Sequence, residues 1–453
     1  MRTVLKPITT IFLIALLAGN YPVSLARAEQ QLGDADFLQF SEAQVELGRL
    51  LFFDKILSGN RNISCSTCHH PQLGTTDNLS LGVGEGGVGL GLKRTAGKAR
   101  DRIKRRVPRN APALWNLGAL EIDVLMHDGR ISVSDIYQNS FNTPAREWLP
   151  QGLVSVVAAQ ALFPMTSETE MAGSNEENEV AGAANQRIDN AWPLIAKRVR
   201  SIPVYSKKFI HAFDDIQSAD QITIVSVANA LAAYISDEFR STDSPYDHWL
   251  AGNENALSEL QNQGRELFFG RATCSNCHGG ALFSHHDFKA LSLPAFGPGR
   301  TRAWDPIARD VGRMGESDNI DDAYRFRVPM LRNVALTAPY GHNGAYPTLE
   351  AMIGHHRNPV ASRRAWEADM AVLPPAPWLQ PTDFIIMQDN LEMQRQASHL
   401  DIALPPISEE DVDALVAFLY SLTGEQAAKQ AFVIPLSVPS GLPLDTLGAM
   451  QLQ

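Results

Sequence analysis

Four cysteines, arranged as two copies of one short pattern, constrain this sequence more than any other feature. The copies are Cys65-Ser66-Thr67-Cys68-His69 and Cys274-Ser275-Asn276-Cys277-His278, and the 453-residue chain has no other cysteine. A C-x-x-C pair alone can be a redox dithiol or half of a zinc site. Because a histidine follows both pairs, we predict two covalently attached c-type haems. Cys65, Cys68, Cys274 and Cys277 would form the thioethers, and His69 and His278 would face the irons.

Residues 1–28 have the features of a cleavable export signal. Arg2 and Lys6 form a basic end, an apolar run covers Ile8–Ala18, and Ala26-Arg27-Ala28 matches a small-x-small cleavage site. The apolar run is too short for a retained membrane helix, and no later run reaches about eighteen apolar residues. We therefore expect a soluble periplasmic protein without a membrane span. All cysteines are used by the two motifs, so no structural disulfide is expected.

The segments that precede the two motifs resemble each other, which predicts an internal repeat. Leu47–Phe53 reads LGRLLFF, and Gly264–Phe269 reads GRELFF. Their apolar residues have helical spacing, and β-alternating segments are few. We predict a mainly α fold with two cytochrome c-like haem domains in tandem and long loops. The first domain would cover 29–245 and the second 255–425, followed by a tail at 426–453.

Three polar stretches in the first half are predicted to be loops or exposed arms. Gly82–Gly91 is rich in glycine but lacks the Lys-Ser/Thr pair of a phosphate loop, which indicates a flexible segment beside the haem. The basic run from Lys93 to Arg106 is interpreted as a solvated arm, with a contact to haem propionates or to an acidic partner as the alternative. The acidic stretch Glu168–Glu179 suits a surface loop.

Taken together, these and further motifs resemble the bacterial di-haem cytochrome c peroxidase family, including its MauG-like branch. The motifs are LGRLLFFD, CSTCH, RNAP, HDGR, CSNCH and LRNVALTAPYGHNG, in that order, and the resemblance runs from about Ser41 to Gly424. It implies that the N-terminal haem is the peroxide site and that the C-terminal haem relays electrons.

The resemblance also implies roles for individual residues. His69 and His278 match the proximal ligands of the two haems, and Gln160, Pro164 and Glu170 match the distal pocket of the first. Glu170 would accept a proton from the inner oxygen of peroxide and return it to the outer oxygen, so that water leaves as the O–O bond breaks. Read without the family pattern, Glu170 is one carboxylate among several in an acidic loop.

A calcium ion between the domains is a further implication of the resemblance. Its ligands would be the side chain of Asn110 and the backbone carbonyls of Thr337 and Pro339, completed by water. Oxygen-only ligation suits a hard cation.

The sequence departs from the family in the loop after the first motif. Standard members carry a histidine there that blocks the first haem in the resting enzyme, whereas this chain has Glu85. No histidine lies between His70 and His127. We therefore predict a first haem that is five-coordinate, or holds water, in the resting ferric protein, as in the MauG-like branch.

Two further departures concern electron transfer. His127 replaces the tryptophan that bridges the two haems in the family, which weakens the expected coupling, and Trp115 is a nearby substitute as an electron relay. The sixth ligand of the second haem, Met or Tyr in known members, is predicted to be His356, with Met352 and His355 as rivals. A second imidazole lowers the haem potential relative to an axial methionine.

These features predict a periplasmic di-haem peroxidase. Its substrate would be hydrogen peroxide, and its partner an electron-donor redox protein or a protein substrate; the net charge of −11 argues against nucleic acid and favours a basic redox partner. One alternative is a MauG-like enzyme that oxidises Tyr or Trp residues of a partner protein. Another is a non-catalytic di-haem electron-transfer cytochrome. The sequence leaves a homodimer open.

Overall fold

The computed structural model describes residues 30–301, 305 and 308–447, and within them the fold is mainly helical, as predicted. The predicted export signal at 1–28 lies outside the described residues. The helices of the first half are α2 (Glu42–Phe53), α3 (Cys65–Cys68), α4 (Val156–Ala161), α5 (Glu179–Gln186), α6 (Ala191–Arg200), α7 (Pro203–Ala212), α8 (Ile224–Glu238) and α9 (Pro245–Leu250). Those of the second half are α10 (Glu259–Phe269), α11 (Met314–Ser317), α12 (Leu349–Arg357), α13 (Pro359–Ala365), α14 (Gln380–Asp383), α15 (Asn390–Ser398), α16 (Glu409–Tyr420) and α17 (Glu425–Lys429).

The strands are short and lie at the junction of the two halves. β1 (Val124–Leu125), β2 (Ile131–Val133) and β3 (Phe141–Asn142) form an antiparallel sheet in that order. β4 (Phe288–Lys289) pairs with β5 (Phe326–Arg327). The backbone N–H of Arg327 donates to the carbonyl of His127 at 2.7 Å, so the two sheets meet beside the H-D-G-R turn.

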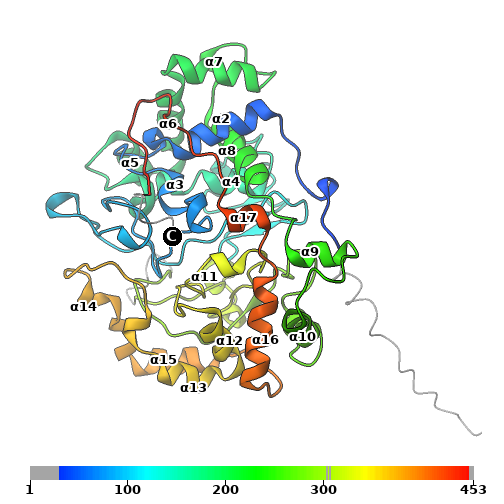
Figure 1. Ribbon diagram of the computed structural model, residues 1–453. Helices are drawn as coiled ribbons and strands as arrows, with labels where there is room; N and C mark the ends of the chain where they lie inside the picture. Colours follow the sequence, from blue (N-terminus) through cyan, green and yellow to red (C-terminus); the bar gives the residue numbers. More distant parts are fainter. Residues whose placement is uncertain (1–29, 302–304, 306–307, 448–453) are drawn as a thin grey trace, which may run out of the picture.

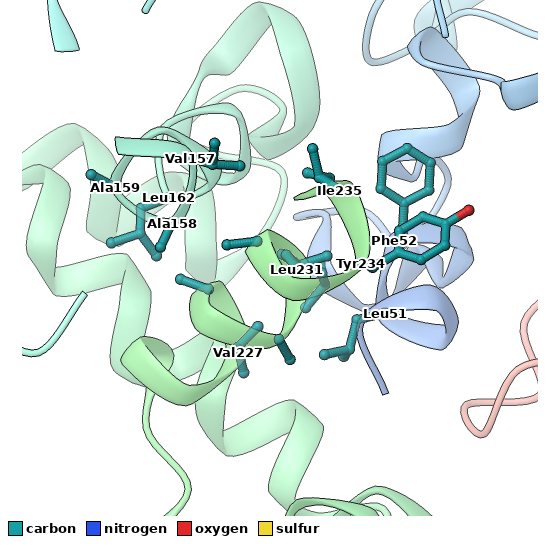
Figure 2. Close-up of a cluster of buried hydrophobic side chains, with 14 of the residues drawn as sticks. Leu51, Phe52, Val157, Ala158, Ala159, Leu162, Val227, Leu231, Tyr234 and Ile235 are labelled. Carbon is teal, nitrogen blue, oxygen red and sulfur yellow. The ribbon is translucent and has the colours of Figure 1, made fainter. Parts of the chain in front are cut away.

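The core of the first half is built around α8. Its buried side chains face α2 on one side and α4 on the other, as Figure 2 shows for Leu51, Leu231 and Ala158. In Figure 1 this half lies above the second half, whose core surrounds α10 and α16. A serine caps the N-terminus of each of the helices α2, α10 and α16, and its side chain accepts a backbone N–H as part of a capping box. The three serines are Ser41, Ser258 and Ser408.

The internal repeat has a direct structural counterpart in two helix crossings. A Cβ atom on Gly48 of α2 would lie 1.9 Å from the carbonyl oxygen of Ala230 in α8. A Cβ atom on Gly264 of α10 would lie at the same distance from the carbonyl oxygen of Ala414 in α16. Only glycine permits such a close approach, so both haem motifs follow a helix that is fixed against a partner helix in the same way.

The segment 431–447 returns to the first half after α17, where Figure 1 shows it in red. Phe432 and Val438 are buried in the core of that half, and Ile434, Leu442 and Leu444 pack against it. The sequence predicted this part only as a tail.

The prediction of a solvated basic arm is wrong for two of its arginines. Arg94 is buried and donates to the carbonyls of Val83, Gly84 and Gly89, which holds the glycine-rich loop in one conformation. Arg106 is buried and pairs with Asp383 through two hydrogen bonds of 2.9 Å. The arm is therefore fixed to the second half of the chain.

Candidate functional site

The first motif forms the short helix α3 and ends at His69, directly after the helix. One ring nitrogen of His69 is hydrogen-bonded to the backbone. Nδ1 of His69 lies 3.1 Å from the carbonyl oxygen of Thr75, so it carries the proton and leaves Nε2 as the electron-pair donor. Burial lowers the pKa of His69, which keeps the imidazole neutral. Cys65 and Cys68 pack against the core, and burial raises the pKa of both thiols to about 12.

The second motif has the same arrangement. Nδ1 of His278 lies 3.2 Å from the carbonyl oxygens of both Phe283 and Pro329. Burial, followed by the nearby charge of His356, lowers the pKa of His278 to about 4. Both motifs thus present a neutral imidazole with a free Nε2, the form that a metal ligand requires.

A cavity of about 320 Å³ lies against the second motif and extends to the first half of the chain. His278 and His356 both line it, together with Cys274, Cys277 and Met352. Nδ1 of His356 lies 2.8 Å from the carbonyl oxygen of Met352, so its Nε2 is also free. The residues therefore fit a haem attached through the two cysteines and held between two imidazoles.

His355, the neighbouring candidate for this ligand, is engaged elsewhere. Its side chain is fully buried, with Nδ1 2.8 Å from the hydroxyl of Tyr346 and Nε2 2.8 Å from the carbonyl oxygen of Leu291. Because both ring nitrogens have partners and His355 does not line the cavity, the structure does not bring it to the second motif.

A buried guanidinium in the same cavity provides a second test of whether the cavity suits a haem. Arg327 lines the cavity, and burial lowers its pKa to about 10. Within the described residues its side chain bonds to the carbonyl of Met126 and contacts Nδ1 of His286, and no carboxylate raises its pKa. A buried cation facing a cavity is suited to an anionic group such as a haem propionate.

The predicted distal residues of the first haem lie on one continuous segment. Gln160 is on α4, Pro164 begins a 3₁₀ turn, and Glu170 is on a π-helical turn at Glu168–Ala172. All three side chains are half-buried. The expected surface loop is therefore an ordered turn at this point.

Glu170 lies within electrostatic range of the first motif. Burial is the main cause of the raised pKa of Cys68, and the charge of Glu170 adds to it. Burial lowers the pKa of Arg130, and the charge of Glu170 opposes this lowering. Gly84 packs directly on this turn, since a Cβ there would lie 2.0 Å from the carbonyl oxygen of Thr169. The sequence reasoning missed Arg130 as a site residue, although the H-D-G-R motif marked its position.

The side chain of Glu85 is bonded to two asparagines. Nδ2 of Asn60 and Nδ2 of Asn62 donate to the same carboxylate oxygen of Glu85, at 2.9 and 2.7 Å. The backbone N–H of Glu85 donates to the carbonyl of Thr169, in the turn that carries Glu170, at 3.3 Å. The loop position that carries a blocking histidine in standard relatives is therefore a half-buried carboxylate with asparagine partners.

Residues predicted to relay electrons line the cavity from the first half. Nε2 of His127 donates to the carbonyl oxygen of Asn110 at 3.1 Å, and burial, together with the charge of Arg109, lowers the pKa of His127 to about 4. Trp115 also lines the cavity, and its indole Nε1 has no partner among the described residues.

An ionic network fixes these residues across the junction. Arg109 pairs with Asp128 at 2.7 Å and with Asp310 of the second half at 2.8 Å. Burial alone would raise the pKa of Asp128, but the guanidinium groups of Arg109, Arg130 and Arg300 hold it well below its usual range.

The predicted calcium ligands also meet at this cavity. Asn110, Thr337 and Pro339 all line it. Nδ2 of Asn110 donates to the carbonyl of Leu79 at 2.7 Å, which leaves the side-chain oxygen available. Among the described residues, no group of three or more His, Cys, Asp or Glu could hold a metal ion.

Comparisons with known proteins agree with this arrangement. A sequence model described as di-haem cytochrome c peroxidase matches residues 42–255. The cytochrome c551 peroxidase of Nitrosomonas europaea is 30% identical over 395 residues, which cover 87% of this chain and 83% of the relative. The chain belongs to the di-haem cytochrome c peroxidase family. It is therefore a haem peroxidase, with haem as its cofactor.

The MauG-like branch of this peroxidase family is also represented among the similar proteins. The methylamine utilization protein MauG of Methylorubrum extorquens is 28% identical over 313 residues, covering 69% of this chain and 68% of that protein. The crystal structure of a MauG-like protein associated with microbial copper homeostasis superposes with a TM-score of 0.56 at 25% identity, covering 89% and 96% of the two chains. No helix among the described residues of this peroxidase is long and apolar enough to cross a membrane.

Proposed function

We propose that this peroxidase reduces hydrogen peroxide at the haem of the first motif, with electrons passed through the haem of the second. The observation that carries the proposal is the pair of positions taken by two carboxylates. Glu170 is half-buried on the turn against which Gly84 packs, whereas the carboxylate of Glu85 is bonded to Asn60 and Asn62. The first haem would then keep an open side beside a proton-transfer group.

The haem iron, when bound, supplies the redox chemistry that cleaves the O–O bond. His69 would hold the iron from the opposite side, with its Nδ1–H fixed by Thr75. Glu170 would take a proton from the inner oxygen of peroxide and deliver it to the outer oxygen, which leaves as water. Gln160 and Pro164 would form the wall that positions the peroxide. Two electrons and two protons convert each peroxide into two waters.

The second haem would be held by His278 and His356. Each imidazole donates its Nδ1–H to backbone carbonyls, which increases the basicity of the free nitrogen. Such a pair favours ferric iron and a low reduction potential. His127 and Trp115 line the space between the sites and are the proposed relay residues, and Asn110, Thr337 and Pro339 are the proposed calcium ligands.

Mixing the ferric holoprotein with one equivalent of peroxide tests this function. A change in the absorption of the first haem is expected, followed by recovery when a reduced donor is added. An unchanged spectrum would exclude peroxide chemistry and favour a plain electron-transfer cytochrome. Removal of divalent cations with a chelator should slow the recovery if calcium fixes the junction.

A MauG-like role in oxidising a partner protein is the second candidate, because the loop after the first motif carries Glu85 in place of the blocking histidine of standard relatives. Steady-state turnover with reduced cytochrome c separates the two. Fast turnover supports peroxide detoxification, whereas slow turnover with oxidised Tyr or Trp products in a partner supports the second role.

We also propose export to the periplasm and covalent attachment of both haems. The four cysteines are free of disulfides, and each pair precedes a histidine. Haem that remains on the chain in a denaturing gel, and a mature N-terminus at Glu29, are the expected results.

A further inference from the structure

The two haem motifs are covered to very different extents, although they occupy equivalent places in the repeat. Ser66 and Thr67, the middle residues of the first motif, are 0% and 1% exposed. In the second motif Asn276 is exposed and Ser275 is half-buried. If the cysteines on either side carry the thioethers, the middle residues would lie beside an edge of the haem. The position of that edge is covered in the first half and exposed in the second.

The segment 431–447, termed the strap below, is what closes the first motif. Its residue Asp445 accepts a hydrogen bond of 2.5 Å from the hydroxyl of Thr67 and pairs with Nζ of Lys55 at 2.6 Å. Asp445 and Lys55 are both largely buried in this pair. The strap therefore bonds directly to a residue inside the haem-attachment sequence.

Two further contacts hold the strap along its length. Ser440 donates its hydroxyl to Asp54 at 2.6 Å, and the hydroxyl of Tyr205 donates to the same carboxylate at 2.7 Å. Phe432 packs against Trp115 and Phe239 with ring centroids 5.9 and 6.0 Å apart. Polar and apolar contacts thus anchor the strap at several points, and Figure 1 shows its course in red along the first half of the chain.

The second repeat has different residues where the first binds the strap. Asp54 and Lys55 directly follow the LLFF sequence, whereas Gly270 and Arg271 follow the equivalent LFF. Arg271 is more than half exposed and pairs with Asp411 of α16, in its own half. The second motif is therefore left without the contacts that cover the first.

We propose that the strap, through the bond between Thr67 and Asp445, shields the first haem of this peroxidase from direct reduction by donor proteins. This inference rests on the proposed function. A donor protein must bring its redox group close to a haem edge, and the strap removes that approach at the first haem. The peroxide site would then receive electrons only from within the molecule.

The test follows reduction of each haem by a protein-sized donor, reduced flavodoxin, without peroxide. Each step moves one electron from flavodoxin to one ferric iron. In the intact holoprotein the second haem should be reduced at a rate proportional to flavodoxin concentration. The first haem should follow at a rate independent of that concentration, because the electron arrives from the second haem.

Loosening the strap should change only the first haem. Asp445→Asn, and a chain ending after Val438 that keeps Phe432 and Val438 in the core, should give the first haem its own concentration-dependent phase. Thr446→Val, at the exposed neighbouring position, is the matched control. Amide exchange over 64–68 should become faster in the two strap variants and stay unchanged in the control, which reports the loss of cover independently of electron transfer.

The proposal would be overturned if reduction of the first haem in the intact protein depended on flavodoxin concentration. It would also be overturned if both strap variants showed faster amide exchange over 64–68 but kept a reduction rate of the first haem that is independent of flavodoxin concentration. Unchanged exchange in both variants would also overturn it, because Asp445 would then not hold the motif. Since peroxide is absent, these outcomes do not depend on the reaction at the first haem. Failure of the proposed function would instead appear as an inert spectrum with peroxide.

Discussion

Nδ1 of His356 donates to the carbonyl oxygen of Met352, four residues earlier on α12, at a distance of 2.8 Å. The bond fixes the imidazole and directs Nε2 away from the helix backbone. Met352 also lines the cavity, so both side chains are candidates for the sixth ligand of the second haem. The hydrogen bond favours His356, because it orients that ring and increases its basicity.

Replacing His356 should therefore remove the sixth ligand of the second haem. His356→Leu is expected to abolish its low-spin bis-imidazole signal in electron paramagnetic resonance, whereas Met352→Leu should preserve it. His355→Phe should leave the signal unchanged while lowering stability, since it removes the hydrogen bonds of His355 to the hydroxyl of Tyr346 and to the buried carbonyl of Leu291. A methionine-to-iron charge-transfer band in the native protein would instead assign the ligand to Met352.

Loss of the Glu170 carboxylate should slow the cleavage of peroxide. Glu170→Gln keeps the shape of the side chain but cannot shuttle the proton, so the rate of reaction with peroxide should fall by about 10²–10⁴-fold. Stopped-flow absorption measures the rate. Glu168→Gln, two residues earlier and exposed, is the control and should react normally. Equal rates in the two variants would mean that Glu170 has no role in proton transfer.

Stability should decrease on acidification through the buried histidine at the junction. The pKa of His127 is about 4 in the folded protein, against an ordinary value of 6.5. Between these values the unfolded chain binds a proton that the folded chain does not, so stability rises with pH over this window and is lost as pH falls. The shift corresponds to about 3 kcal/mol for this group.

The matched variants are His127→Gln and His211→Gln, the latter at an exposed position of α7. Urea unfolding between about pH 4 and 6.5 should show a pH slope that is smaller by up to one proton in the first variant. The second variant should keep the native slope over this window. A native slope in both would place His127 in contact with solvent in the folded protein.

The buried pair between Arg106 and Asp383 should be costly to break on one side. Arg106→Met leaves the Asp383 carboxylate buried without its partner, which is expected to destabilise the protein by about 3–5 kcal/mol. Asp383→Leu combined with Arg106→Met should be less destabilising than either single change. Thermal unfolding of the four proteins gives the coupling energy, and strictly additive effects would show that the two groups do not interact.

The sequence predicted the regular helices and the repeat because these depend on local patterns. The sequence of Ile222–Phe239 predicts a long helix, which is α8, and the S-E-E-D sequence at Ser408–Asp411 predicts the capped start of α16. The C-x-x-C-H motifs and the family resemblance identified the cavity-lining cysteines and histidines. Only the structure separated His355 from His356, because the partners of His355, Tyr346 and Leu291, are set by packing.

Long-range contacts explain what the sequence did not predict. Arg94 and Arg106 belong to a basic run that is indistinguishable from a solvated arm, yet Asp383, the partner of Arg106, is 277 residues away. The strap has no helical or alternating pattern, and its bond to Thr67 joins residues 378 apart. Periodicity carries no information about such pairings.

Electron paramagnetic resonance of the protein as purified, in its ferric state, tests the central claim most directly. With Glu85 bonded to Asn60 and Asn62, the first haem should lack a sixth protein ligand and give a high-spin signal. The second haem should give a low-spin bis-imidazole signal. Low-spin signals from both haems, with no high-spin component, would contradict the account of an open peroxide site.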